Sequence, residues 1–441
     1  MEVRITSREM VKPSSPDLHL LKPFKLSLLD QLSPPNYVPF IFFYTKHSDS
    51  QFESFAQVSD HLKKSLSKTL NQFYPLSGRT KNNLCVSSYE EGVQYVEARV
   101  NACLSDYIEK TEGLFQTLLL YSKLFCYIPN STIPQLAIQL SIFDCGGIAL
   151  AFCCCHKILD ASTVSAFLKS WAAFSRGSNG EIPNPDLLEA PSRFFPPIES
   201  TPPNTSMKGL FFNEGRRETR SFVFDANAIA TLMFKAKSKR LELPSRVVAL
   251  SAFLWKHAIR ASRSTSGILK PAILSQSVNI RQKMKPQLPD YSIGNLFLLP
   301  ITTYNSVEKD VELHDLAYLV REGVESVTGD FLELFQGEEG FKVMSNQLSQ
   351  IAEIVSKGNA QFYILSSWLN TLEGKEDFGW GKPTLFSIPG VDSHNREFSN
   401  CIILKGTGQH KAIEAWVTLS DKEMAFLEQD PEFLAFASRN P

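Results

Sequence analysis

A proline-rich stretch in the middle of the chain limits the folds it can adopt. Residues 176–208 are dominated by Pro, Ser, Asn and Gly. The prolines are Pro183, Pro185, Pro191, Pro196, Pro197, Pro202 and Pro203. This composition is typical of a connection and not of a helix or strand. The 441 residues also exceed the roughly 250–300 at which one hydrophobic core stops growing. We therefore predict two domains, residues 1–180 and 211–441, joined by a long crossover loop over residues 181–210.

Apolar periodicity indicates that strands and helices alternate in both halves of the chain. Helical spacing is found over residues 55–73, in the segment after Asp160, and over residues 244–261. Strands are indicated over residues 84–86, 92–98, 136–141, 148–153 and 219–224. We expect the first two of these strands to pair, and the next two to form a hairpin through Gly146-Gly147. Such alternation predicts an α/β fold.

Composition excludes several classes of partner. Lys and Arg number 45 against 46 Asp and Glu, with no basic stripe, so neither nucleic acid nor an anionic membrane is expected. Met1–Pro13 has no continuous apolar run, which argues against a secretory signal. The longest apolar stretch, Ile148–Cys155, is too short to cross a bilayer. The cysteines follow no repeating pattern and are expected to be reduced thiols. We predict a cytoplasmic monomer that binds a small, weakly charged ligand.

The candidate catalytic pattern is His156 at the end of an apolar strand, with Asp160 at the start of the following helix. Imidazole has an unperturbed pKa of about 6.5, so near neutral pH it can take a proton from a hydroxyl and return it to a leaving group. Taken alone, the pattern more often marks a buried structural histidine and a helix cap. A metal site formed by Cys153–Cys155 and His156 is disfavoured, because consecutive strand residues point to opposite faces.

Two further motifs change this assessment. Asp377-Phe378-Gly379-Trp380-Gly381 lies far downstream, and Phe73–Arg79 reads Phe-Tyr-Pro-Leu-Ser-Gly-Arg. Together with the His156 and Asp160 segment, they make the chain resemble the BAHD acyltransferases over essentially its whole length. The Asp-Phe-Gly triplet is not that of a protein kinase, because neither a Gly-rich phosphate loop nor a His-Arg-Asp loop accompanies it.

Within that family the sequence is most similar to the vinorine synthase-like, alkaloid-acetylating branch. The matching segments are Pro13–Pro16, Leu29–Leu32, Leu62–Leu70, Val278–Arg281 and Gly294-Asn295. The chain departs from the commoner family pattern at Lys157, where a second His is frequent, and at Ala161, where Gly is frequent. The resemblance implies two chloramphenicol-acetyltransferase-like domains of mixed sheets and helices. It also implies that residues 363–388 pack back against the N-terminal domain.

The resemblance implies roles for individual residues. His156 would be the general base, and Asp160 would pair with Arg281 to hold the loop. The acyl carbonyl would lie beside Ser366 and Trp368, with Asn295 near the pocket, and these residues are candidates to stabilise an oxyanion. Coenzyme A would be bound near Ser245 and Arg246 at a helix start. The second signature, Asp377, Phe378, Gly379, Trp380 and Gly381, would be structural and would lie near the coenzyme A channel. Tyr37, Phe40 and Phe43 either line the acceptor side or belong to the core.

The function that the resemblance implies is an acyl-CoA-dependent O-acyltransferase acting on a hydroxyl of a plant specialised metabolite such as an alkaloid. Acetyl-CoA is the expected co-substrate, with neither a tightly bound cofactor nor a metal. A malonyl group would need a fixed cation. The last third of the chain offers few, because Arg396 and Arg439 lie in polar or terminal segments and Lys405 and Lys411 are expected to be solvated. The alternatives are transfer to a simpler alcohol or amine, and a non-catalytic ligand-binding relative.

Overall fold

The computed structural model describes residues 2–45, 54–110, 118, 134–178, 184–187, 190–199, 216–305, 311–335, 337–369, 371–372, 374–388, 400–407 and 411–439. Much of the predicted crossover over 181–210 lies outside these residues, as does Arg396.

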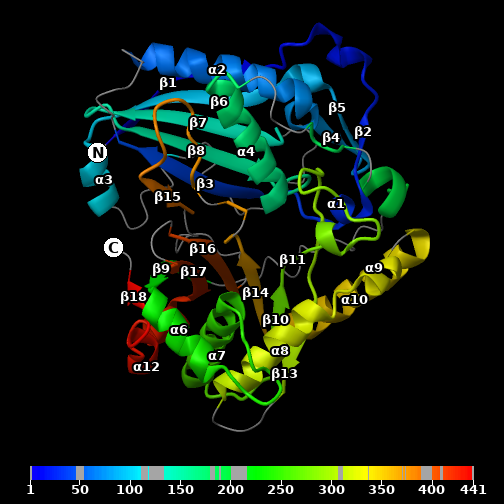
Figure 1. The fold of residues 1–441 in the computed structure, drawn as a ribbon, viewed down its shortest axis with the longest axis vertical. Coiled ribbons are helices and arrows are strands. Elements are labelled where there is room, and N and C mark those ends of the chain that lie inside the picture. The colour runs from blue at the N-terminus through cyan, green and yellow to red at the C-terminus, as the bar shows by residue number, and fades with distance from the viewer. Residues whose placement is uncertain are drawn as a thin grey trace.

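Strands of the first half and one short strand from the second half form a mixed sheet that has six strands among the described residues (Figure 1). In spatial order the strands are β1 (Val3–Val11), β6 (Val93–Val100), β7 (Leu136–Phe143), β8 (Ile148–Cys155), β3 (Tyr37–Tyr44) and β15 (Leu385–Ser387). Helices α2 (Phe55–Gln72) and α4 (Ala161–Ser175) pack on one face of this sheet, and α3 (Leu104–Lys110) packs on the other. A small sheet of β2 (Phe24–Lys25), β5 (Cys85–Ser87) and β4 (Arg79–Lys81) lies near the short helix α1 (Leu28–Leu32).

The second half is built on another mixed sheet, which has seven strands among the described residues. In spatial order they are β13 (Ile301–Tyr304), β10 (Ala272–Gln276), β14 (Gln361–Ser367), β16 (Asn400–Gly406), β17 (Ile413–Ser420), β9 (Arg217–Phe224) and β18 (Ser438–Arg439). One face packs against α6 (Ala226–Lys235), α7 (Arg246–Ser266), α8 (Leu313–Glu325), α11 (Asp421–Leu427) and α12 (Pro431–Leu434). Helix α10 (Gly337–Ser356) covers the other face and follows α9 (Gly329–Glu333). A separate ladder joins β11 (Val278–Asn279) to β12 (Phe297–Leu298).

Most of the predicted elements are confirmed. Helix α2 begins after a capping box in which Ser54 and Gln57 bond each other's backbone, and its buried side chains recur at helical spacing. The β7–β8 hairpin, α4, β9 and α7 also lie where the periodicity placed them. The pairing predicted for residues 84–86 and 92–98 is wrong. Strand β5 pairs with β2 and β4, whereas β6 pairs with β1 and β7, because apolar periodicity marks a strand without selecting its partner.

The two halves are joined at the sheets as well as by the chain. After β14 of the second sheet, the chain crosses to the first sheet, where β15 pairs antiparallel with β3. Along this segment, Ser165 of α4 donates a hydrogen bond to the carbonyl oxygen of Thr371 (2.6 Å), and Ser175 donates to that of Phe378 (2.7 Å). These contacts fix the second half against α4, which begins beside His156.

Among the described residues, no helix combines the length and apolarity needed to span a bilayer.

Candidate active site

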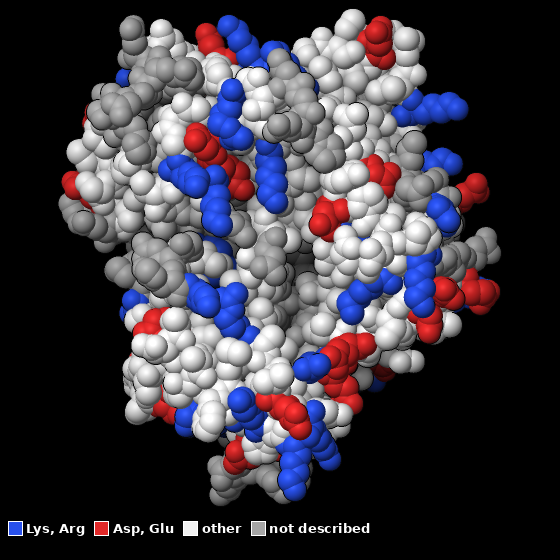
Figure 2. All heavy atoms as spheres, viewed as in Figure 1, with Lys and Arg blue, Asp and Glu red and all other residues white. Residues whose placement is uncertain are grey.

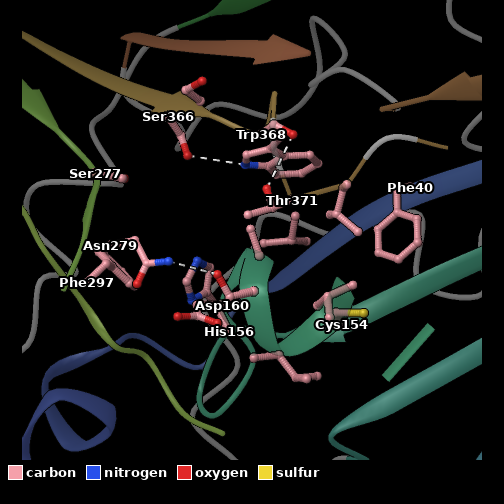
Figure 3. Close-up of a pocket in the computed structure, with 17 residues that line it drawn as sticks. Phe40, Cys154, His156, Asp160, Ser277, Asn279, Phe297, Ser366, Trp368 and Thr371 are labelled. Atoms are coloured by element: carbon pink, nitrogen blue, oxygen red, sulfur yellow. Dashed lines mark hydrogen bonds between the residues drawn. The ribbon is translucent and has the colours of Figure 1, made fainter. Parts of the chain in front are cut away.

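A pocket of about 110 Å³ lies between the two halves, and His156 is among the residues that line it (Figure 3). From the first half it is lined by Val38, Phe40, Cys154, His156, Leu159, Asp160, Ala161, Ser162 and Val164. From the second half it is lined by Ser277, Asn279, Phe297, Ser366, Ser367, Trp368, Thr371 and Leu372. The face shown in Figure 2 is hollowed between the halves, and its basic and acidic side chains are interspersed. The pocket therefore combines an apolar wall with a few convergent polar groups, as small-molecule sites do.

His156 is the first residue after β8, and its position is fixed at both backbone and ring. Its backbone N–H donates to the carbonyl oxygen of Asn36 (2.7 Å). Its ring Nδ1 lies 3.0 Å from Oδ1 of Asn295, and the ring meets that of Phe297 edge-on at 5.7 Å between centroids. Burial lowers the pKa of His156, and Asp160 and Asn295 oppose this shift only in part. The imidazole is therefore neutral near pH 7.

The hydrogen bonds of Asn295 determine the tautomer of His156. Nδ2 of Asn295 faces three acceptors, namely Oδ1 of Asp30 (3.0 Å) and the carbonyl oxygens of His156 (2.8 Å) and Lys157 (2.9 Å). Since only an NH₂ group can donate to them, Oδ1 must be the atom that faces His156. An amide oxygen accepts, so Nδ1 of His156 carries the proton and Nε2 carries the lone pair. Asn295 thus holds His156 in the form that a general base requires.

Asp30 supports Asn295 from behind. Its Oδ1 also accepts the backbone N–H of Asn295 (2.8 Å), and its Oδ2 accepts the N–H (2.9 Å) and hydroxyl (2.7 Å) of Ser27 in the capping box of α1. Burial raises the pKa of Asp30. Gly294, with φ of +124°, passes so close that an added Cβ would lie 3.3 Å from the Asp30 carboxylate. Asp30 therefore fixes the loop that presents Asn295.

Lys157 replaces the second histidine that is frequent in the family pattern, and the structure gives it a structural position. Its ammonium donates to the carbonyl oxygens of Gln31 (3.0 Å) and Ser33 (2.6 Å) at the end of α1. Burial lowers the pKa of Lys157 to about 8, against the opposing charges of Cys155 and Asp30. Lys157 thus joins the turn after β8 to α1.

The carboxylate of Asp160 is engaged by protein groups. Its two oxygens accept Nη1 (2.7 Å) and Nη2 (3.1 Å) of Arg281, which has a fully buried side chain. The same carboxylate accepts the backbone N–H of Thr163 (2.8 Å), capping α4, and that of Leu296 (3.1 Å). The structure therefore brings together the predicted pair of Asp160 and Arg281, and combines it with the helix cap that was the alternative interpretation.

Ser366 and Trp368 lie across the pocket from His156 (Figure 3). The indole Nε1–H of Trp368 donates to Oγ of Ser366 (3.2 Å). This bond occupies a lone pair of the serine oxygen and leaves its hydroxyl hydrogen available to a third group. Because hydrogen bonds in a chain polarise one another, the hydroxyl becomes a better donor. Both residues were predicted to lie beside the acyl carbonyl, and both line this pocket.

Asn295 lies near the pocket, in contact with His156. Its amide nitrogen faces three protein acceptors and its oxygen faces His156, so these contacts favour a positioning role over that of an oxyanion donor. Of the aromatic candidates, Phe40 lines the pocket, whereas Tyr37 and Phe43 belong to the core on the opposite face of the sheet. Alternation along β3 separates them.

The second signature makes contacts within the protein. Oδ1 of Asp377 accepts the backbone N–H groups of Gly379 (2.8 Å) and Gly381 (2.9 Å), whose positive φ values close the turn. Phe378 packs against Trp171 at 4.9 Å between centroids, and Trp380 belongs to the same buried core. None of these five residues lines the pocket described above. The described contacts of these residues fit the structural role that the resemblance implies, and their position near coenzyme A stays a prediction.

Ser245 and Arg246 lie at the start of α7, outside the pocket. Ser245 caps the helix by accepting the backbone N–H of Val248 (3.2 Å), and Arg246 donates to the carbonyl oxygen of Lys411 (3.3 Å). Arg246 is exposed. This leaves the predicted phosphate position at a solvent-accessible helix start.

Lys405 was expected to be solvated, and this is wrong. It is buried, 2.7 Å from the carboxylate of Glu414, and its ammonium lies 4.9 Å from the ring centroid of Phe386 in β15. Lys405 lies in β16, which pairs with β17. Its side chain is buried because Phe386, in the first sheet, packs against its ammonium group. The cation already has a carboxylate partner.

Several site residues could not be identified from the sequence. Asp30 lies within Leu29–Leu32, a segment noted only for its resemblance, although a serine three residues before an aspartate is the signal of a capping box. Ser277, Asn279, Phe297 and Thr371 line the pocket from separate segments of the second half. Cys154 also lines it, whereas Cys153 and Cys155 face the opposite core. This alternation agrees with the exclusion of a site formed by all three thiols.

A model of a protein family described as the Transferase family matches residues 1–434. Epi-neemfruitin B 7-O-acetyltransferase from Melia azedarach is 36% identical over 100% of this chain and 99% of its own. Vinorine synthase from Rauvolfia serpentina is 34% identical over 96% of this chain and 95% of its own.

The structure is also similar to solved ones. The crystal structure of vinorine synthase superposes with a TM-score of 0.82 at 31% identity, covering 100% of this chain and 99% of that one. An F. graminearum protein solved with coenzyme A and T-2 mycotoxin superposes with a TM-score of 0.76 at 17% identity, covering 95% and 100%. These similarities confirm the predicted fold class of two chloramphenicol-acetyltransferase-like domains of mixed sheets and helices.

Proposed function

Since the chain belongs to the Transferase family of BAHD acyltransferases, we propose that it transfers an acetyl group from acetyl-CoA to a hydroxyl of a plant specialised metabolite. The observation that carries the proposal is the neutral His156, held by Asn295 as the Nε2 base at a pocket between the two halves. Three relatives, namely epi-neemfruitin B 7-O-acetyltransferase, limonoid 7-O-acetyltransferase and vinorine synthase, support the acetyl donor and an acceptor of the alkaloid or limonoid kind.

In the proposed mechanism, both substrates meet in the pocket at His156. Nε2 removes the proton of the acceptor hydroxyl while its oxygen attacks the thioester carbonyl. The Ser366 hydroxyl, polarised by Trp368, donates to the oxyanion that forms. Collapse of the tetrahedral intermediate expels the coenzyme A thiolate, which takes the proton back from His156. Each step uses groups that line one side or the other of the same pocket.

We also propose the finer features that the sequence predicts. The domains span residues 1–180 and 211–441 with the crossover between them, and the segment 363–388 packs back against the N-terminal domain. The pairing of β15 with β3 supports this for the end of the segment, whereas its first residues, 363–367, belong to β14 of the second sheet. Coenzyme A is a dissociable co-substrate whose phosphates approach Ser245 and Arg246. The protein acts as a cytoplasmic monomer, without metal, nucleic acid or membrane.

Release of coenzyme A on mixing the enzyme with acetyl-CoA and a panel of alkaloid, limonoid and phenolic alcohols tests the proposed function. Mass spectrometry of the products should show an acceptor that gains one acetyl group. One control omits the enzyme from the same panel. A second replaces the alcohols with their amine analogues. If acetyl-CoA binds but no alcohol on a broad panel is acetylated, the protein would instead be a non-catalytic relative.

We expect acetyl-CoA to be preferred over malonyl-CoA by about tenfold or more in kcat/KM, because an unpaired buried carboxylate costs well over the 1.4 kcal/mol that corresponds to tenfold. Among the described cations, Arg281 is paired with Asp160 and Lys405 with Glu414. Arg439 pairs with Glu428 at an exposed edge. The measurement is kcat/KM for acetyl-, malonyl- and hydroxycinnamoyl-CoA with one accepted alcohol. A malonyl value above the acetyl value would contradict the prediction.

The pH dependence of kcat/KM should reflect the lowered pKa of His156. Burial disfavours the imidazolium, so the base stays neutral and active below the ordinary histidine pKa of about 6.5. We expect activity to fall on the acid side only below pH 6.5. The control is a protein incubated at each pH and assayed at pH 7, which separates titration from unfolding. If the acid limb of the kcat/KM profile were centred above pH 7, a carboxylate, and not Asn295, would control the pKa of the His156 ring.

A further inference from the structure

Two cysteines outside the active site lie next to each other at the surface. Cys103 immediately precedes α3, and Cys145 lies in the turn between β7 and β8; both are exposed and in the thiol form. The backbone N–H of Asp144 donates to the carbonyl oxygen of Ala102 (3.1 Å), and that of Leu104 donates to Sγ of Cys145 (3.2 Å). The residues on both sides of Cys103 are therefore bonded to Cys145 or to its neighbour.

The backbone of the turn allows this close approach. Gly146 adopts a positive φ of +82°. An added Cβ at Gly147 would lie 2.8 Å from Cδ2 of Leu104. A larger residue at position 147 would push the turn away from the start of α3. The close packing at Gly147 therefore holds Cys103 and Cys145 beside one another.

The two neighbouring thiols affect each other's acidity. Partial burial raises the pKa of the Cys145 thiol, but hydrogen bonds from the N–H groups of Leu104 and Gly147 and from Cys103 outweigh it, so the pKa falls below its ordinary value. The neighbouring Cys145, and then Asp106 and Asp144, raise the pKa of Cys103. Cys145 is thus the better thiolate, and Cys103 is positioned to react second.

We propose that Cys103 and Cys145 form a reversible redox site, which closes to an intramolecular disulfide by exchange with a small disulfide such as oxidised glutathione. The Cys145 thiolate attacks one sulfur of the oxidant, forming a mixed disulfide and releasing one glutathione thiolate. The Cys103 thiolate then attacks the Cys145 sulfur and expels the second glutathione. The two protein thiols are oxidised, one glutathione disulfide is reduced, and the two protons of the protein thiols pass to the two glutathione thiolates that are released.

The disulfide would tie the start of α3 to the start of β8, the strand that ends at His156. A bridge between segments so far apart in the sequence stabilises chiefly by restricting the unfolded chain. We therefore expect the oxidised protein to have a melting temperature a few degrees above that of the reduced one, an effect that a reductant reverses. The site lies apart from the pocket, so this outcome does not depend on the proposed acyl transfer.

The test is incubation of the full-length protein with oxidised glutathione, followed by intact-mass and peptide mass spectrometry. We expect the loss of two hydrogen atoms and a single linked peptide pair containing Cys103 and Cys145. The variant Cys103→Ser should instead stop at the glutathione adduct on Cys145, and Cys145→Ser should react slowly. Cys85→Ser is the matched control and should form the bridge normally.

Two results would overturn the proposal. One is a native protein that accumulates only mixed disulfides at Cys103 or Cys145 without closing. The other is a bridge from Cys145 to Cys126, which lies outside the described residues. The variant Cys126→Ser separates the proposed bridge from a bridge to Cys126, because only the proposed bridge can form when Cys126 is absent.

Discussion

Replacing His156 with alanine is expected to lower kcat by about 10²–10⁴-fold, the contribution of a positioned general base. The imidazole is the group whose unprotonated Nε2 faces the reacting hydroxyl in the proposed mechanism. The change leaves Ser366, Trp368 and the apolar wall of the pocket in place. Affinity for coenzyme A should therefore stay within a few-fold of the original. The measurements are kcat from coenzyme A release and the Kd of coenzyme A by calorimetry.

The matched control is His314→Ala, the same change at an exposed histidine on α8. It should leave kcat unchanged. Activity of His156→Ala within a few-fold of the original enzyme would remove the base from the mechanism. A loss of coenzyme A binding equal to the loss of rate would instead assign His156 to the binding of the donor.

The variant Asp160→Asn should lose about 3 kcal/mol or more of stability, the usual cost of leaving one member of a buried ion pair without its partner. Asparagine can still cap α4, because its amide oxygen can accept the N–H of Thr163. It cannot balance the charge of Arg281, which is fully buried. We expect a lower melting temperature together with a lower rate, measured by thermal unfolding and by kcat.

Asp225→Asn provides the control, because Asp225 caps α6 through the N–H of Ala228 (2.7 Å) at an exposed position. It makes the same chemical change at a helix start without a buried arginine, and should shift the melting temperature little. A fall in rate for Asp160→Asn with an unchanged melting temperature would make the carboxylate catalytic and its structural role wrong.

Local patterns in the sequence predicted most of the helices and strands that surround the site. The apolar spacing of α2 and α4 and the glycines before β8 are local signals, and they place His156 at the end of a strand. The pairing of Asp160 with Arg281 came from the family resemblance, because no local pattern relates two residues so far apart in the chain. The same lack of long-range information explains the wrong partner predicted for β5.

The environment of buried polar groups was the part that the sequence could not predict. Asn295 was a candidate oxyanion donor near the pocket, but the sequence does not show that its amide nitrogen faces Asp30 and two backbone carbonyls. Lys405 was expected in solvent, but Glu414 and Phe386 enclose it. Neither environment follows from the sequence, because a polar side chain is satisfied by whichever partner the tertiary fold brings near.

Strand β15 affects how the protein can fold while the ribosome is still synthesising it. In the first sheet, β3 has residues that are almost all buried and apolar, and among the described residues its outer edge is covered by the short segment 384–387 that contains β15. During synthesis, the N-terminal half emerges and folds first, while these residues have yet to be made. Until then Ile41, Phe42 and Phe43 present unpaired backbone groups on an apolar edge, which is a template for pairing with another chain. The N-terminal half therefore depends on the last part of the chain for its solubility as well as for its active site, and products that end before residue 385 are the ones expected to aggregate.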